Sequence, residues 1–416
     1  MERLFQLKII TILLFFRTMY NAYSKTIIVK ADSKQNTIKK AFEKAQNGDT
    51  IIIKSGIYRE GSLYLNKAVT IIGESFPEID GQNKHENLLV EHDNVVIKNI
   101  LFSNSGSSSF NDIAALKIKN AQHVRIENCN FKNNFFGIHT INSSYISYLN
   151  NKLTSGQTKG KPSANGIHIW KSEHLTIENN TIEGHRDGIY LEFVKNSYIE
   201  NNKSIGNKRY GMHFMFSHDN LFKKNLFQKN GAGVAVMYSK RVEMIENKFA
   251  QSWGSAAYGV LLKEIDDSKI IGNEFSDNTI AVYGDGANRI EIRNNHFLRN
   301  GWALKLNASS SEAVVTNNNF VRNTFDVATN GKLKVKSFNG NYWDKYEGYD
   351  LNKDGIGDVP YHPLSLFTVL VGKNPAAMLL YRSFMITLLD KSEKVLPSIT
   401  PDYFKDEKPL IRSIKL

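Results

Sequence analysis

The chain has 416 residues, 41% of them hydrophobic and 11% aromatic, which excludes an intrinsically disordered protein and allows one large domain or two average ones. A single cysteine excludes an intramolecular disulfide, so a buried core has to supply the stability. The formal net charge of +12 suits anionic polysaccharide, lipid head groups or acidic proteins as partners, without choosing among them.

Residues 1–24 are predicted to be an export signal. Arg3 and Lys8 precede an apolar run over residues 9–16, and small residues end this segment at the spacing of an A-x-A-like cleavage site. The run is too short to cross a bilayer, which needs about 20 residues. A membrane tether or a buried N-terminal segment is the alternative. Cleavage before Lys25 would place the mature protein outside the cytoplasm, in the periplasm, where nucleic acid is not an expected partner.

Residues 38–45 are predicted to form an amphipathic helix, because their apolar side chains recur at helical spacing. Asn36 is the predicted N-cap and Gly48 the predicted stop. The strand-like segment TIIIK follows directly. We expect this helix to cover the N-terminal end of the repeat that follows, since an uncovered strand edge invites aggregation.

A unit consisting of Asn, any residue and an apolar residue recurs along most of the remaining chain, mostly every 22 or 23 residues. The unit begins at Asn99, Asn151, Asn180, Asn225, Asn247, Asn273, Asn295, Asn318 and Asn341, and Cys129 and Asn202 occupy the same slot. This period, with short β-rich segments, predicts an all-β right-handed parallel β-helix over residues 25–345. Longer steps indicate loops that project outward, most clearly residues 154–165.

Equivalent Asn residues are expected to stack as a ladder inside one corner, with their amides bonded to one another and to the turn backbone. Cys129 is interpreted as a small buried member of this ladder rather than as a thiolate ligand.

A glycine follows most ladder slots about eight residues later, and the residues after it alternate in character. The residue after the glycine is apolar on every rung, so it should face the interior, and the next residue should face out. In the segment GMHFMF this alternation predicts that Met212, Phe214 and Phe216 pack inside. His213 and Met215 are then predicted to face out.

The outward positions of consecutive rungs collect an unusual set of side chains. Five of them form a candidate site for transient copper binding, His139, His168, His213, Met215 and Met237. Imidazole and thioether donors suit copper, and thioethers favour Cu(I). The alternative is a protein-docking patch, because aromatic residues and Met are favoured at interfaces. The docking candidates here are Trp170, Tyr190, Glu192 and His218, and the two interpretations are compatible.

Carbohydrate cleavage or epimerisation is the rival function for this fold, and it needs carboxylates that converge from adjacent rungs. The positions just before the aligned glycines carry Phe136, Asp187, Tyr210, Ala232 and Tyr258, with one carboxylate among them. We therefore expect a protein that is not an enzyme, with a polysaccharide lyase or epimerase as the alternative.

Residues 346–416 are predicted to be a C-terminal unit with two features. Asp350, Asn352, Asp354 and Asp358 stand at positions 1, 3, 5 and 9 of an EF-hand-like loop, but Tyr361 occupies position 12. A structural Ca²⁺ and a metal-free turn both remain open.

The apolar residues of 376–389 then suit a short amphipathic helix, interpreted as a cap on the stack or as a docking element. Its docking candidates are Leu379, Leu380, Phe384 and Met385.

The segment from Gly188 to Pro401 closely resembles the NosD family. The resemblance is carried by DGIYLEFVKNSYIENN, RYGMHFMFSHDN, NGAGVAVMYSKRVEM, WGSAAYGVLLKEIDDS, NTFDVATN and GNYWDKYEGYDLNKDGIGDVPYHP. It implies a periplasmic β-helix protein without enzymatic activity that works with an ABC transporter in denitrification. That role would be to relay copper from a copper chaperone to the apo form of nitrous oxide reductase. Membrane association would be through the transporter, on whose membrane subunits the segment 376–389 would dock. A scaffold that docks partners without touching metal is the further alternative.

Overall fold

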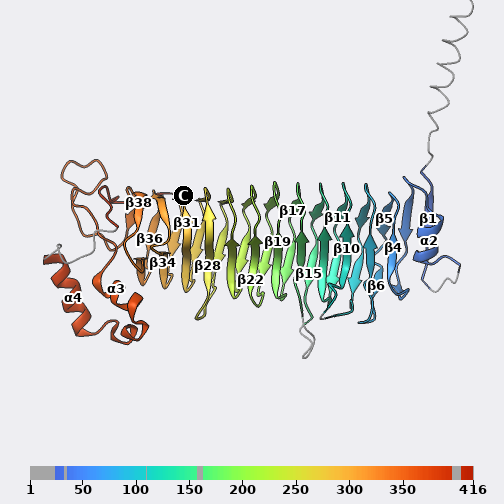
Figure 1. Cartoon of the computed structure of the whole chain (residues 1–416), viewed down its shortest axis with the longest axis horizontal. Helices are drawn as coiled ribbons and strands as arrows, with labels where there is room; N and C mark the ends of the chain where they lie inside the picture. Colours follow the sequence, from blue (N-terminus) through green and yellow to red (C-terminus); the bar gives the residue numbers. More distant parts are fainter. Residues whose placement is uncertain (1–23, 32–34, 109, 157–162, 396–403, 416) are drawn as a thin grey trace, which may run out of the picture.

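The computed structural model describes residues 24–31, 35–108, 110–156, 163–395 and 404–415. These residues wind into an elongated parallel β-helix, which confirms the predicted fold class (Figure 1). The predicted export signal, apart from its last residue, and the centre of the predicted outward loop at 154–165 lie outside the described residues.

Most turns of the helix contribute one strand to each of three columns. The first column contains β4 (Leu63–Leu65), β7 (Leu88–Val90), β10 (Ala114–Lys119), β13 (Phe136–Ile141), β16 (Ile167–Trp170), β19 (Asp187–Glu192), β22 (Tyr210–Met215), β25 (Ala232–Met237), β28 (Tyr258–Asp266), β31 (Ile280–Asn288), β34 (Trp302–Leu306) and β37 (Phe325–Ala328). The second column contains β1 (Thr26–Val29), β2 (Thr50–Ile53), β5 (Thr70–Gly73), β8 (Val96–Lys98), β11 (Arg125–Glu127), β14 (Ser147–Leu149), β17 (Thr176–Glu178), β20 (Tyr198–Glu200), β23 (Leu221–Lys223), β26 (Glu243–Ile245), β29 (Lys269–Ile271), β32 (Glu291–Arg293), β35 (Ser311–Thr316) and β38 (Lys334–Ser337).

The third column contains β3 (Ile57–Tyr58), β6 (Glu78–Asp80), β9 (Leu101–Ser103), β12 (Asn130–Lys132), β15 (Lys152–Thr154), β18 (Thr181–Glu183), β21 (Lys203–Ile205), β24 (Leu226–Gln228), β27 (Lys248–Ala250), β30 (Glu274–Ser276), β33 (His296–Leu298), β36 (Asn319–Val321) and β39 (Tyr342–Trp343). This column forms a 13-stranded sheet, and the other two are joined in one 26-stranded sheet. Every strand pairing is parallel and links a rung to the next one, so equivalent residues stack along the axis.

Apolar side chains that point inward from the strands fill the interior. Rings of the third column stack on one another from Phe227 through Phe249 and Phe275, with centroids 5.3 and 4.8 Å apart. In the first column Met212 and Phe214 are fully buried, as the alternation predicts. Each such side chain contributes roughly 1.5–3 kcal/mol through burial.

The predicted Asn ladder is present, and it satisfies amides that no water can reach. The side-chain nitrogen of Asn225 donates to the carbonyl of Ile199 at 2.9 Å and to the Asn247 side chain at 3.0 Å. Cys129 is buried in this column and its backbone N–H donates to Asn151, so its interpretation as a ladder member is confirmed. This pattern repeats on successive rungs, which makes the ladder the main polar element of the interior.

Asn99 does not belong to the ladder, contrary to the prediction. Leu101 pairs with Asn130, so Ile100 stands below Cys129 and fills the slot. Asn99 itself is in the left-handed region (φ 59°) and bonds to Asn128 on the outside.

A second ladder, which we did not predict, lines the corner before the first column. Its members are Asn207, Asn230, Asn278, Asn300 and Asn323, each bonded to a neighbour in the column or to the adjoining backbone.

Helix α2 (Ile38–Lys44) contacts the first strands and buries Ile38, Ala41 and Phe42, in agreement with the predicted amphipathic helix. Its N-cap is Thr37 rather than Asn36, because the Thr37 hydroxyl accepts from the N–H of Lys40 at 3.2 Å. The helix ends before Gly48 is reached, with Ala45 as its C-cap.

The C-terminal residues pack against the last rungs in two pieces. The predicted single helix over 376–389 is wrong, because that segment is divided between the 3₁₀ helix η1 (Pro375–Leu380) and α4 (Phe384–Val395), and a further helix, α3 (Leu366–Lys373), precedes it. Phe367 and Val371 of α3 pack with Phe325 of β37. None of the described helices is both long enough and apolar enough to cross a membrane.

Residues 404–415 then return to the end of the stack. The Asp406 carboxylate accepts hydrogen bonds from the backbone N–H and side chain of Asn341, at 3.0 and 3.2 Å, and from the indole of Trp343 at 3.0 Å. Asn341 is the last Asn of the ladder, so Asp406 satisfies the end that has no further rung.

The ladder makes a first prediction. Asn225→Ala leaves the buried backbone N–H of Asn202 without its acceptor and removes one of the three hydrogen bonds of the Asn202 side chain, so the free energy of unfolding should fall by roughly 2–4 kcal/mol. Urea denaturation followed by circular dichroism measures this change. Gln228→Ala, which removes an exposed hydrogen bond on the next strand, is the control and should stay within about 0.5 kcal/mol of the parent. Equal losses in the two variants would contradict a structural role for the ladder.

Candidate functional site

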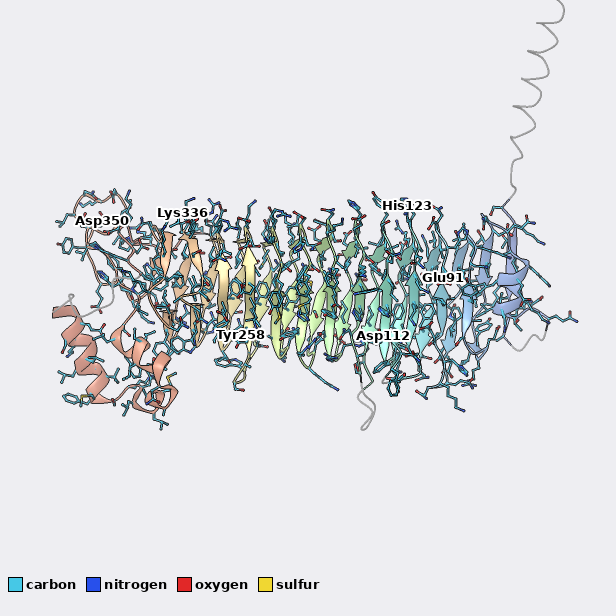
Figure 2. The ribbon with its side chains drawn as sticks, in the orientation of Figure 1. Glu91, Asp112, His123, Tyr258, Lys336 and Asp350 are labelled. Carbon is cyan, nitrogen blue, oxygen red and sulfur yellow. The ribbon has the colours of Figure 1, made fainter. Side chains whose placement is uncertain are left out.

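The outward face of the first column carries the predicted site residues, between two edges of the stack. Figure 2 shows His123, in the turn after β10, at the upper edge, and Tyr258, at the start of β28, at the lower edge. The strands in between place one set of side chains outward on consecutive rungs, with Tyr190, His213 and Ala235 in register.

His213 faces outward as predicted, yet it is only 5% exposed. Its ring lies between the rings of Tyr190, with centroids 4.6 Å apart, and Tyr210, at 4.9 Å. Neither imidazole nitrogen has a hydrogen-bond partner. Buried polar atoms without partners are uncommon, and here they mark a place where a bound group would satisfy the ring.

A buried acid lies behind this imidazole. The Asp187 carboxylate is fully buried and accepts two hydrogen bonds from Arg209, one of them 2.8 Å long. Burial raises the pKa of Asp187. The hydrogen bonds from Arg209 and the proximity of His213 outweigh this effect and hold that pKa below its usual value. The nearest Asp187 oxygen is 3.8 Å from His213 Nδ1, too far for a hydrogen bond but close enough to orient the ring electrostatically.

The two other candidate histidines lie on the rungs below. His139 and His168 stack at 4.7 Å, and His168 stacks on Tyr190 at 4.8 Å. Burial lowers the pKa of His139 to about 4 and that of His168 to about 3, with neighbouring cations or imidazole adding to the effect. Both rings are therefore neutral at pH 7, the form that binds metals.

The thioethers of Met215 and Met237 complete the set beside His213. They are partly exposed, and the two residues pair directly across neighbouring strands. Neighbouring strands are about 4.8 Å apart, so the two flexible side chains can approach one ion together with His213. Three soft donors of this kind suit Cu(I).

The five candidate copper ligands do not form one site. Two imidazole nitrogens on one ion lie at most about 4 Å apart, since each metal–nitrogen bond is about 2 Å long. His168 and His213 stack on opposite faces of Tyr190, and they are therefore too far apart to share an ion. The column separates into a His139–His168 pair and a cluster of His213, Met215 and Met237. Among the described residues, no three or more His, Cys, Asp or Glu side chains are grouped to hold a metal ion.

The docking candidates on this face occupy different environments. Trp170 is half-buried, with the Lys171 ammonium 4.3 Å from its ring centroid. Tyr190 and Glu192 are half-buried in the outward column. His218 accepts a hydrogen bond from the backbone N–H of Lys240 at 3.1 Å, so one of its ring nitrogens is already engaged.

The docking candidates of the tail are highly exposed. Leu379 is 90% and Phe384 84% exposed, and Leu380 and Met385 are exposed beside them. They gather at the C-terminal end of the stack, where Figure 1 shows α3 and α4. Exposed apolar residues gathered in this way are typical of interaction sites.

The Asp-rich loop bonds largely to itself. The Asp350 carboxylate accepts from the N–H groups of Asp354 and Gly355, at 3.2 and 2.9 Å. Asp358 accepts from the N–H of Leu351 at 2.7 Å, and Asn352 donates to Asp354 at 3.1 Å. These bonds hold the turn without an ion, and Ca²⁺ binding at the loop stays a prediction.

Phe216 corrects the prediction for GMHFMF, because it is 38% exposed and not inside. The strand ends at Met215, and Phe216 adopts the left-handed region (φ 49°), where the alternation of faces stops. Its ring stacks between Phe193 at 5.2 Å and Tyr238 at 5.0 Å. We call these three residues, Phe193, Phe216 and Tyr238, the aromatic ridge.

The ridge lies at a turn whose backbone is left-handed on successive rungs, so its unusual feature is the residue type. All three residues have positive φ, which costs an ordinary side chain about 1–2 kcal/mol. Equivalent turn positions two and three rungs below Phe193 carry Asn142 and Asn120, the residue type that tolerates this conformation best. On the lower rungs this turn position carries Asn, and higher up three successive aromatic residues replace it. That change is the sequence signal that would have revealed the ridge.

An open pocket of about 580 Å³ lies beside the lower end of the ridge, on the turns that follow β10, β13 and β16. Asn142, Ser144, Lys171 and Phe193 are among its lining residues. None of the five candidate copper ligands lines it.

The fold is that of a parallel β-helix protein, and its outer face carries the candidate imidazole and thioether donors. A profile of the family described as "Periplasmic copper-binding protein (NosD)" matches residues 149–348. The part of the chain over residues 149–348, a little under half of it, therefore belongs to the NosD family.

Individual relatives are similar along much of the chain. A protein of Stutzerimonas stutzeri named "Probable ABC transporter binding protein NosD" is 26% identical over 375 residues, which cover 85% of each chain. A protein of the same name from Pseudomonas aeruginosa is 30% identical over 162 residues, or 38% of this chain and 37% of the relative. The catalytic unit of a GH87 α-1,3-glucanase from Streptomyces thermodiastaticus superposes with a TM-score of 0.63 at 15% identity, over 78% of this chain and 69% of that one. The last similarity concerns the fold alone.

A pH-dependent stability follows from His185, a fully buried residue at the corner below Asn207. Burial lowers the pKa of its imidazole from 6.5 to about 4. Between these two values the unfolded chain binds a proton that the folded chain does not, so stability should fall as the pH drops through this window. The loss reaches on the order of 3 kcal/mol at the acid end.

His185→Asn restores the residue type of the corner ladder and should reduce the loss of stability below pH 6.5. Urea denaturation at pH 7.5, 6, 5 and 4.5 measures this difference. Parallel stability curves for parent and variant would show that His185 is not the group responsible.

Proposed function

We propose that this protein is a periplasmic accessory protein of an ABC transporter, and that it accepts Cu(I) and relays it without catalysing a reaction. The observation that carries the proposal is the buried, unpartnered imidazole of His213 beside the thioethers of Met215 and Met237 on two paired strands. Family membership supports copper as the ion. The His139–His168 pair is proposed as a second, weaker position along the same column.

The proposed acceptor is apo-nitrous oxide reductase, and the proposed donor is a copper chaperone. Both proposals rest on the family resemblance, and the names of the relatives support an ABC transporter as the partner. Imidazole and thioether donors add no negative charge around the ion, which we expect to ease the release of Cu(I) to a partner. This property suits a relay better than storage.

Direct Cu(I) titration tests the site. In competition with a chromogenic chelator, Met215→Ala/Met237→Ala should weaken Cu(I) affinity at least roughly tenfold, about 1.4 kcal/mol, because the imidazole alone remains. Met385→Ala removes an exposed thioether from α4 and is the matched control, which should bind like the parent. A parent protein that binds Cu(I) no more tightly than the double variant would end the copper proposal.

The exposed apolar residues of η1 and α4 are proposed to dock on the membrane subunits of the transporter. Deleting the tail would be a poor test, since it removes Asp406 and uncaps the Asn ladder. Leu379→Ser/Phe384→Ser instead changes two side chains that are 90% and 84% exposed. We expect less transporter to co-purify with this variant at an unchanged melting temperature.

Trp253→Ser, an exposed aromatic residue in the turn before β28, is the control for this experiment. It should retain the transporter. Undiminished co-purification of the Leu379→Ser/Phe384→Ser variant would refute docking through the tail.

A polysaccharide lyase or epimerase is not proposed. The one carboxylate aligned before the glycines of the candidate rungs, Asp187, is fully buried and bonded to Arg209. It is therefore poorly placed to exchange a proton with a bound sugar.

A further inference from the structure

The aromatic ridge of Phe193, Phe216 and Tyr238 is exposed where the fold does not require aromatic residues. Its members are 45%, 38% and 36% exposed, and all three hold left-handed backbone conformations. At the equivalent turns below, Asn142 donates to Asn120 at 2.8 Å, so the same position supports a bonded amide ladder. Exposed aromatic residues on three consecutive rungs, at a turn position that Asn and Lys fill on the rungs below, indicate a role outside the fold.

The ridge is continuous with the candidate copper site. Phe216 follows Met215 directly and Tyr238 follows Met237, so each aromatic residue borders one thioether. The backbone N–H of Phe193 donates to the carbonyl of Met215 at 3.0 Å, and that of Phe216 to the carbonyl of Met237 at 3.1 Å. A molecule that rests on the ridge therefore lies next to both thioethers.

The charged groups around the ridge are largely neutralised within the chain. Lys195 pairs with Glu173 at 3.0 Å and Lys240 with Asp266 at 3.3 Å. Arg241 binds Asp219 through two hydrogen bonds, one of 2.8 Å. On a chain of net charge +12, this leaves a locally balanced surface, whose complement is an uncharged, apolar contact face.

The ridge is also small. Three partly exposed aromatic side chains offer on the order of a few hundred Å², whereas a stable interface buries about 800 Å² on each partner. This size excludes a lasting dimer through the ridge alone and fits a partner that binds briefly.

We propose that the aromatic ridge is the landing surface for the protein that exchanges Cu(I) with His213, Met215 and Met237. The partner contacts the ridge with an apolar face around its own copper ligands, so that the ion passes between two sets of soft donors at close range. The proposal rests on the copper function proposed above and adds the surface through which that function meets its partner.

The ring arrangement favours a protein over a saccharide. The ridge rings are stacked with interplanar angles of 8° and 18°, so their inner faces are occupied by one another. Ring edges and the outer faces at the two ends remain, and these suit packing among apolar side chains.

The decisive variant is Phe193→Asn/Phe216→Asn/Tyr238→Asn, which gives the ridge the residue type of the turns below. Two Cu(I) donors are compared by stopped flow: a small Cu(I)–chelator complex and the soluble domain of a Cu(I)-loaded periplasmic chaperone. We expect uptake from the chelator to be unchanged, uptake from the protein to slow at least roughly tenfold, and the melting temperature to stay equal or rise.

The matched control is Tyr145→Asn. Tyr145 is also exposed, left-handed and stacked between two rings, those of His123 and His174, but it lies away from the candidate ligands. It should leave both uptake rates unchanged. Phe216→Lys is a second variant, because Lys171 occupies the same turn position two rungs below.

The outcomes separate the proposals. Unchanged uptake from the protein donor in the triple variant and in Phe216→Lys would overturn the landing surface while leaving the copper site standing. A lower melting temperature with unchanged uptake would overturn it too, and would assign the ridge a structural role. If the parent takes up no Cu(I) even from the chelator, the copper function fails and the landing surface with it. Loss of binding to an oligosaccharide of uronic acids, in place of slower copper uptake, would replace the protein partner by a saccharide.

Discussion

The need to satisfy buried amides at the corners of the coil governs the whole structure. A corner that turns the chain inward removes peptide groups from water, and each side-chain amide of the ladder replaces that water for two neighbouring rungs. Because one amide serves the rung below and the rung above, the period of the sequence is held close to 22 residues. Longer steps are admitted only as loops that leave the coil and return in register.

This fixed register explains how a binding site arises on such a scaffold. Residues at one phase of the repeat become direct neighbours along the axis, although 22 or more positions separate them in sequence. A single rung offers too few donors to hold a metal ion, but two paired rungs bring Met215 beside Met237. The same stacking also limits the site, because Tyr190, inserted between His168 and His213, divides the histidines into two groups.

Sequence periodicity was sufficient to predict the coil, its interior and the outward direction of the candidate ligands. Strand alternation correctly placed Met212 inside and Met215 outside, since the two residues lie in one regular strand. It failed at Phe216 because the chain leaves the strand there for a left-handed residue, and alternation holds only where φ and ψ are extended. It also misassigned Asn99, for two Asn columns differ by one residue and only the pairing of strands distinguishes them.

The burial of His213 could not be predicted, because its covering rings are Tyr210, at the start of its own strand, and Tyr190 on the rung below. Nor could the pairing of Asp187 with Arg209, which joins two turns through side chains that no repeat constrains.

The carboxylate of Asp406 gives the stack an end. Each rung exposes backbone groups that can pair with a further strand. A coil with an open last rung can therefore add a strand from any chain nearby. Asp406 blocks such pairing, because its carboxylate accepts hydrogen bonds from Asn341 and Trp343 and has no N–H group to donate to a further rung. Since Asp406 lies 65 residues after Asn341, the end of the ladder stays open to wrong partners until the segment beyond the coil has folded back onto it. Termination of the coil is therefore a matter of timing as much as of shape.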